Sequence, residues 1–171
     1  MITASFQSFA DPPWTSVKVL RVGCVPTTLR TPDIFVFVEN DGAPFIRIDI
    51  YGDNDCSAFE DVIVWREFVV IGFGSRVHMV NYQDQEASTV ELDSYFGHFY
   101  PGEDWLIIAS GNRLLLIGSI GSVIWKTQIL GLDGVIVDSI EGNLINGQGE
   151  WDPPGGWRPF RVKLDTGEQI S

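Results

Sequence analysis

The sequence predicts an all-β protein built from antiparallel meander sheets, and three observations carry that prediction. Aromatic residues make up 12% of the chain and glycine is frequent, whereas periodic blocks of helix-forming residues are missing. Residues 104–127 consist of short apolar runs separated by turn residues. Residues 40–43 carry a strong hairpin signal. Runs this short and this rich in branched side chains favour strands over helices.

The meander in residues 104–127 contains three runs, Trp105–Ala109, Arg113–Gly118 and Val123–Thr127. They are separated by Ser110–Asn112 and Ser119–Ser122, which are rich in glycine, serine and asparagine. Glycine and asparagine accept a positive φ where the chain reverses direction. We therefore expect three antiparallel strands in succession.

The hairpin is predicted from Ile34–Glu39 and Pro44–Tyr51, joined by a reversal at Asp41 and Gly42. Asp-Gly is one of the preferred pairs for a two-residue turn. Apolar and polar side chains alternate along both runs, so we expect one face to be buried and the other to be wet.

The start of the chain, residues 1–16, shows no clear period, and we expect an extended segment there. Trp14 follows two prolines that stiffen the backbone, which would let its ring dock on the domain surface. Residues 17–171 are expected to form a single all-β domain.

An internal repeat extends the meander. With an offset of 37 residues, Val69–Ile71 falls on Leu106–Ile108, and Met79–Val80 falls on Leu116–Ile117. A looser third copy begins near Gly134. Periods of this size indicate stacked β units, each unable to bury its own face alone. The expected units are residues 61–93, 94–130 and 131–171.

Two segments carry resemblances. The phrase Val162–Glu168, together with Leu115–Ile117 and Gly121–Trp125, resembles the strand-turn-strand signature of quinoprotein-type propeller blades. The segment GEWDPPGGWRPF, Gly149–Phe160, resembles one found in small uncharacterised bacterial proteins. The first resemblance implies propeller-like four-stranded sheets and no particular activity. Because closed propellers need four or more blades, we expect either a propeller-like arrangement or an open sandwich, to which the N-terminal hairpin adds a unit.

Charge and targeting signals narrow the function classes. The formal net charge of −12 argues against nucleic acid and anionic membrane as partners, and it permits a basic protein partner. The sequence shows no secretory signal and no apolar run long enough to cross a membrane, so a cytoplasmic protein is expected. Cys24 and Cys56 are isolated in the sequence and are expected to be reduced thiols.

Motifs that would carry catalysis, a cofactor or a metal are missing from the sequence, so enzymatic activity lacks support. His78 falls inside a strand pattern and is expected to face outward or to be a hydrogen-bonded core residue. His98 stands in the aromatic cluster of residues 94–100 and is expected to be packed rather than catalytic. The acidic stretch of residues 52–61 lacks the EF-hand pattern, which favours a polar surface loop over a calcium loop.

The candidate binding element is the loop Gln148–Trp157, which replaces the short turn of the other copies. A proline pair and a glycine pair should give this loop one shape, and it carries two tryptophans. In the alternative, both tryptophans fold back and plug the sheet. The expected partner-binding residues are Tyr95, His98, Glu150, Trp151, Asp152, Trp157 and Arg158.

Two functions follow as hypotheses. The first is a non-catalytic protein-binding domain of a cytoplasmic bacterial protein, for instance one that neutralises a basic partner such as a toxin. The alternative is a small-ligand module that binds carbohydrate or calcium. The exposure of Trp151 and Trp157 discriminates them: a flat acidic and aromatic face favours a protein, and a cleft with converging carboxylates favours a small ligand.

Overall fold

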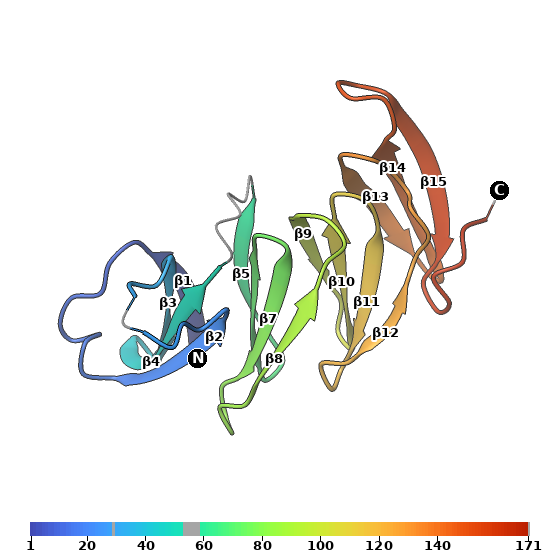
Figure 1. The fold of residues 1–171 in the computed structure, drawn as a ribbon. Coiled ribbons are helices and arrows are strands. Elements are labelled where there is room, and N and C mark those ends of the chain that lie inside the picture. Colours follow the sequence, from blue (N-terminus) through green and yellow to red (C-terminus); the bar gives the residue numbers. More distant parts are fainter. Residues whose placement is uncertain (29, 53–58, 171) are drawn as a thin grey trace. The chain divides into compact units, whose positions relative to one another are not determined.

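The computed structural model describes residues 1–28, 30–52 and 59–170. Across these residues every regular element is a β-strand, and there are 15 of them (Figure 1), which confirms the all-β prediction. The described part of the chain contains no helix long and apolar enough to span a membrane.

The chain divides into two compact units, and each has its own hydrophobic core. Unit 1 holds residues 1–52 and 60–91 of the described chain, and unit 2 holds Phe59 and residues 92–170. The expectation of a single domain over residues 17–171 stays a prediction.

Unit 1 contains two four-stranded sheets, whose buried valine and isoleucine side chains form one core. In sheet A the strand order is β1-β3-β4-β2, with β2 parallel to β4 and the other pairs antiparallel. Sheet B is an antiparallel meander in the order β5-β6-β7-β8. The strands are β1 (Ile2–Gln7), β2 (Lys18–Gly23), β3 (Ile34–Asn40), β4 (Ala43–Tyr51), β5 (Glu60–Trp65), β6 (Phe68–Phe73), β7 (Arg76–Asn81) and β8 (Ala87–Glu91).

The β3–β4 hairpin confirms the strongest local prediction. Asp41 has φ of 50° and Gly42 has φ of 76°, so both turn residues are left-handed, as a tight reversal between twisted strands requires. Val36 and Val38 are fully buried in the core of unit 1. Phe37 lies between them in sequence and points to the other face of the sheet.

The N-terminal segment contributes strand β1 to sheet A and a tryptophan that packs on this sheet. β1 pairs with β3 over its whole length, so part of the expected extended segment belongs to sheet A. Trp14 stacks on Phe37 with ring centroids 4.1 Å apart, and its carbonyl accepts a hydrogen bond from Arg47. Arg47 forms a two-point ion pair with the buried Asp49. The predicted docking of Trp14 is confirmed.

His78 of β7 is a buried, hydrogen-bonded residue of unit 1, which is one of its two expected placements. Its Nδ1 lies 2.9 Å from the hydroxyl oxygen of Thr89. Burial, helped by the positive charge of Arg76, lowers the pKa of His78 to about 4. Cys24 is exposed just after β2, and Cys56 lies outside the described residues, so the expected reduced state of both thiols stays a prediction.

Unit 2 contains sheet C, in the order β12-β11-β10-β9, and sheet D, in the order β13-β14-β15. The yellow strands of sheet C lie beside the orange and red strands of sheet D in Figure 1, and both sheets contribute to one core. The strands are β9 (Phe96–Pro101), β10 (Trp105–Ser110), β11 (Leu114–Gly118), β12 (Val123–Lys126), β13 (Val135–Glu141), β14 (Leu144–Glu150) and β15 (Trp157–Lys163).

Sheet C confirms the three-stranded meander predicted for residues 104–127 and adds β9 in front of it. The 37-residue offset places β6 on β10 and β7 on β11, and each pair has the same position in its sheet. Ile71 and Ile108 are fully buried at equivalent positions. The residue boundaries of the repeat units themselves stay a prediction.

Trp125 of β12 links sheet C to the turn that follows β15. Its side chain is 9% exposed, and its indole N–H donates to the carbonyl of Leu164 at 2.9 Å. A Cβ on Gly167 would lie 2.8 Å from the indole, and Gly167 has φ of 71°. Glycine in the Asp-Thr-Gly turn thus serves both the backbone reversal and the approach of the ring.

Candidate functional site

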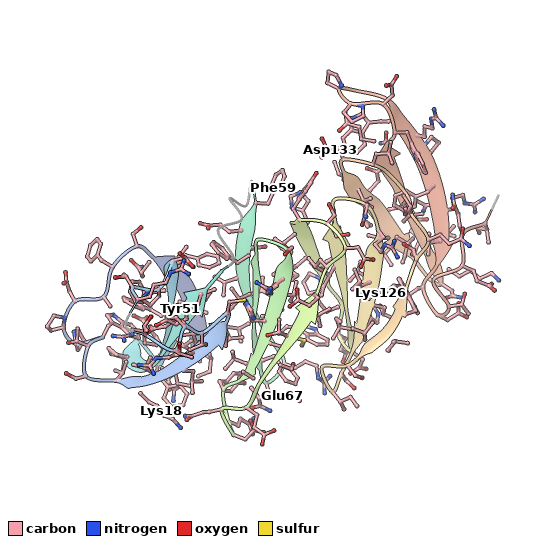
Figure 2. The ribbon with its side chains drawn as sticks, in the orientation of Figure 1. Lys18, Tyr51, Phe59, Glu67, Lys126 and Asp133 are labelled. Carbon is pink, nitrogen blue, oxygen red and sulfur yellow. The ribbon has the colours of Figure 1, made fainter. Side chains whose placement is uncertain are left out.

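A pocket of about 310 Å³ lies in unit 2, where the first residues of β9, β13 and β15 meet the last residues of β10 and β14. Aromatic rings, carboxylates and glycines line it. Figure 2 labels two of its lining residues, Phe59 and Asp133, near the upper ends of the strands in that view. Its main side chains are Phe59, Tyr95, His98, Asp133, Glu150 and Trp157.

Trp157 and Glu150 come from sheet D as directly opposed residues of β15 and β14. Their side chains therefore stand next to each other on one face of the sheet. The indole of Trp157 packs on Gly134, where a Cβ would lie only 2.9 Å from a ring carbon. Trp157 as a whole residue nevertheless stays 38% exposed.

Glu150 also shapes the loop that follows it. One carboxylate oxygen accepts a hydrogen bond from the backbone N–H of Gly155. The backbone N–H of Glu150 donates to the carbonyl of Gly134 at 2.9 Å. These bonds hold the half-buried carboxylate at the pocket wall.

Tyr95 is held by both sheets. Its hydroxyl donates to the backbone carbonyl of Asp133 at 2.8 Å, and its ring packs on Gly111, where a Cβ would lie 2.6 Å away. Burial first, and then the negative charges of Asp133 and Glu150, raise the pKa of Tyr95 to about 12. The phenol is therefore neutral at ordinary pH, and the charges of both carboxylates converge on it.

Phe59 and His98 complete the aromatic wall. The Phe59 ring stacks on Tyr95 with centroids 5.9 Å apart, and it lies 5.5 Å from the His98 ring at a tilt of 58°. Phe59 is 43% exposed, and His98 is exposed as well. His98 contacts aromatic rings as expected, but it lies at the surface rather than inside the core.

The two carboxylates of the pocket, Asp133 and Glu150, carry its negative charge. Within residues 1–28, 30–52 and 59–170, no Lys, Arg or His forms an ion pair with Asp133 or Glu150. Asp133 is exposed and Glu150 is half-buried. A bound cation would therefore find two available carboxylates beside exposed aromatic surface.

The structure divides the seven expected site residues into two groups. Tyr95, His98, Glu150 and Trp157 line the pocket together. Trp151 and Arg158 form a separate pair, with the guanidinium carbon 5.8 Å from the indole ring, and Asp152 is exposed at the start of the loop. Trp157 and Arg158 face opposite ways because neighbouring strand residues alternate between the two faces of a sheet.

The alternative in which both tryptophans plug the sheet stays a prediction, which the stability of Trp157→Ala tests. Trp157 is 38% exposed and Trp151 is half-buried, so neither belongs to the core of unit 2. The loop is ordered by its own backbone hydrogen bonds: Trp151 N–H donates to the Gly156 carbonyl, and Gly156 N–H donates to the Asp152 carbonyl.

Sequence reasoning missed Phe59, Asp133 and the glycines beneath the rings. Gly111 stands in a predicted turn, and Gly134 stands directly after Asp133, so both read as ordinary reversal signals. Their second role, as flat surfaces for Tyr95 and Trp157, depends on contacts between segments far apart in the chain. No local pattern marks that role.

The pocket is equipped for binding. Exposed rings can stack on a flat ligand, and carboxylates can accept hydrogen bonds from ligand donors. Among the described residues, no group of three or more histidine, cysteine, aspartate or glutamate side chains could hold a metal ion.

Comparison with known proteins gives the fold and no activity. No family model matches the chain, and no curated protein matches it. Among solved structures, Citrobacter koseri AztD aligns over 82% of this chain and 41% of its own, with 15% identity and a TM-score of 0.52. The computationally designed Ika4 protein aligns over 70% and 74%, with 9% identity and a TM-score of 0.51.

The WD40 domain of Neurospora crassa Pan2 aligns over 80% of this chain and 45% of its own, with 8% identity and a TM-score of 0.49. The chain thus spans less than half the length of AztD and of the Pan2 domain. At these identities the likenesses show the fold alone. The fold is all-β and built mainly of antiparallel meander sheets, as expected, although sheet D has three strands where the resemblance implied four.

Proposed function

We propose that unit 2 is a non-catalytic module that binds a basic protein partner at the surface around the pocket. The observation that carries this proposal is the pairing of exposed rings with two carboxylates that form no ion pair with Lys, Arg or His among the described residues. Rigid aromatic side chains lose little entropy on association, which is why they dominate binding hot spots.

The surroundings of the pocket support a macromolecular partner. Ile136, which lines the pocket, is 39% exposed, and Leu132, next to the pocket-lining Asp133, is 57% exposed, so exposed apolar surface lies in and beside the pocket. The net charge of −12 would steer a basic protein toward the chain and speed encounter. Neutralisation of a basic toxin in a bacterial cytoplasm is the narrower form of this proposal, and it rests on the charge and on the resemblance of Gly149–Phe160.

A carbohydrate ligand is the second candidate, because a half-exposed indole beside a carboxylate also suits a sugar ring. A sugar is neutral, so its binding would depend little on salt, whereas a basic protein would bind less tightly as salt rises. The calcium version depends on residues 52–61, of which 53–58 lie outside the described residues.

The test uses two neighbouring residues on opposite faces of β15. Wild type, Trp157→Ala and Arg158→Ala are each used to capture proteins from the source cell, and proteins lost only with Trp157→Ala are purified. Their affinities for the three chains are then measured at low and high salt. Arg158→Ala is the matched control, since it alters the other face of the strand.

The proposal predicts a basic partner that binds wild type and Arg158→Ala alike, and binds Trp157→Ala at least about tenfold more weakly. The affinity should also fall with salt. The proposal would be overturned by a purified partner that binds Trp157→Ala as tightly as wild type. An acidic partner whose affinity does not change with salt would also overturn it.

A further inference from the structure

We propose that the pocket receives an arginine side chain of the partner, with its guanidinium stacked on Trp157 and hydrogen-bonded to Glu150 and Asp133. This inference rests on the proposed function, and it names the group that the partner inserts. Four features of the pocket lead to it.

The first feature is exposed aromatic surface. The outer edge of the Trp157 indole, at Cη2, packs on Gly134, and the 38% of the residue's surface that stays exposed is available to a ligand. A guanidinium is planar and weakly hydrated, and it stacks on aromatic rings. Tryptophan is the best partner for such a contact.

The second feature is the placement of acceptors next to that surface. Glu150 is directly opposite Trp157 across the strand pair, and Gly155 occupies one of its carboxylate oxygens. Asp133 is exposed at the same pocket. Charge-assisted hydrogen bonds from a guanidinium to carboxylates are about twice as strong as neutral ones.

The third feature is that the field of both carboxylates reaches the interior of the pocket. The charges of Asp133 and Glu150 both contribute to the raised pKa of the Tyr95 phenol. A cation placed near this phenol would therefore feel both carboxylates at once.

The fourth feature is the acceptor character of the two carboxylates, which suits a ligand rich in donors. The Tyr95 hydroxyl hydrogen is already given to the Asp133 carbonyl. The pocket's charged groups are acceptors, and a guanidinium presents five N–H donors with no acceptor to satisfy. A sugar hydroxyl needs both donors and acceptors.

The experiment measures small probes on the full chain without any partner. N-acetyl-arginine methylamide, its lysine equivalent and its neutral isostere, N-acetyl-citrulline methylamide, are titrated while the indole N–H resonance of Trp157 is followed by NMR. Trp157→Phe assigns that resonance. Methyl glucoside is titrated in parallel as the carbohydrate probe.

Glu150→Gln is the informative variant, because glutamine keeps the oxygen that accepts from Gly155 while it removes the charge. Glu141→Gln is the matched control: it makes the same change at an exposed glutamate at the far end of β13. Both variants are compared by circular dichroism, so that a folding defect would be seen.

The arginine probe is expected to shift the Trp157 resonance in a saturable way, and to bind at least about tenfold more tightly than the citrulline probe. Glu150→Gln should weaken the arginine probe about tenfold, and Glu141→Gln should leave it unchanged. Equal binding of arginine and citrulline probes, tighter binding of the lysine probe, or a response only to methyl glucoside would each overturn the inference.

The two proposals fail separately. If a basic partner is lost with Trp157→Ala but the arginine probe does not bind, the guanidinium inference fails and the protein-binding proposal stands. If the arginine probe binds and no protein depends on Trp157, the protein-binding proposal fails, and the ligand is a free guanidino compound.

Discussion

Two tryptophans of unit 2 lie on glycines and behave differently. Trp125 packs on Gly167, is 9% exposed and donates its indole N–H to Leu164. Trp157 packs on Gly134 and keeps 38% of its surface in water. In both, the missing Cβ lets the ring approach the backbone closely.

The difference lies in how much of each tryptophan the rest of unit 2 covers. Trp125 belongs to the core cluster shared by sheets C and D, so its ring stabilises the fold. Trp157 lies outside that cluster and borders the pocket, so part of its surface is left for a ligand. The following predictions test whether the first ring serves stability and the second serves binding.

The largest effect is expected for Trp125→Ala. It removes a buried ring and leaves the Leu164 carbonyl without its donor, so the free energy of unfolding should fall by about 3 to 5 kcal/mol. Urea denaturation followed by circular dichroism measures the change. Trp125→Phe should cost less, since it keeps most of the packing. A loss below about 1 kcal/mol would show that the ring is not structural.

The next effect is expected for Gly167→Ala, with Gly134→Ala as its counterpart. Gly167 has φ of 71° and a ring carbon 2.8 Å from the new Cβ, so alanine should destabilise the chain by about 2 kcal/mol. Gly134→Ala meets the Trp157 ring at 2.9 Å, and that ring can move outward. Gly134→Ala should therefore shift the Trp157 indole resonance and change stability by less than about 1 kcal/mol. Equal losses of stability would contradict the distinction.

Trp157→Ala should cost about 1 to 2 kcal/mol of unfolding free energy, because much of the ring is in water before the substitution. The same denaturation experiment as for Trp125→Ala gives a direct comparison. A loss as large as that of Trp125→Ala would place Trp157 with the structural residues and remove the support for the pocket.

The effect confined to high pH concerns the phenol of Tyr95, whose pKa is raised to about 12 in the folded chain. Because the fold favours the neutral form, its contribution to stability is complete below about pH 10 and is lost as the pH rises through 12. The difference between the ultraviolet titrations of wild type and Tyr95→Phe isolates this group. Glu150→Gln should lower the pKa, since it removes one neighbouring negative charge; an unchanged pKa would mean that Glu150 does not act on the pocket interior.

Interactions between neighbouring residues determine the turns and the faces of the strands. The Asp41-Gly42 reversal and the Asp-Thr-Gly turn depend on backbone preferences, and the strand faces depend on a two-residue alternation. Such signals lie within one strand pair and can be read from neighbouring residues. The alternation also separates Trp157 from Arg158, although both were expected to bind the same partner.

The sequence by itself determined the strand content, the hairpins and the presence of a distinctive loop between β14 and β15. Only the tertiary structure decided that Tyr95 and Glu150 share a pocket with Phe59 and Asp133, and that Trp125 is buried while Trp157 is not. The reason is physical. Turns and alternation act between residues close in sequence. The exposure of a ring depends instead on its packing against segments that are distant in the chain.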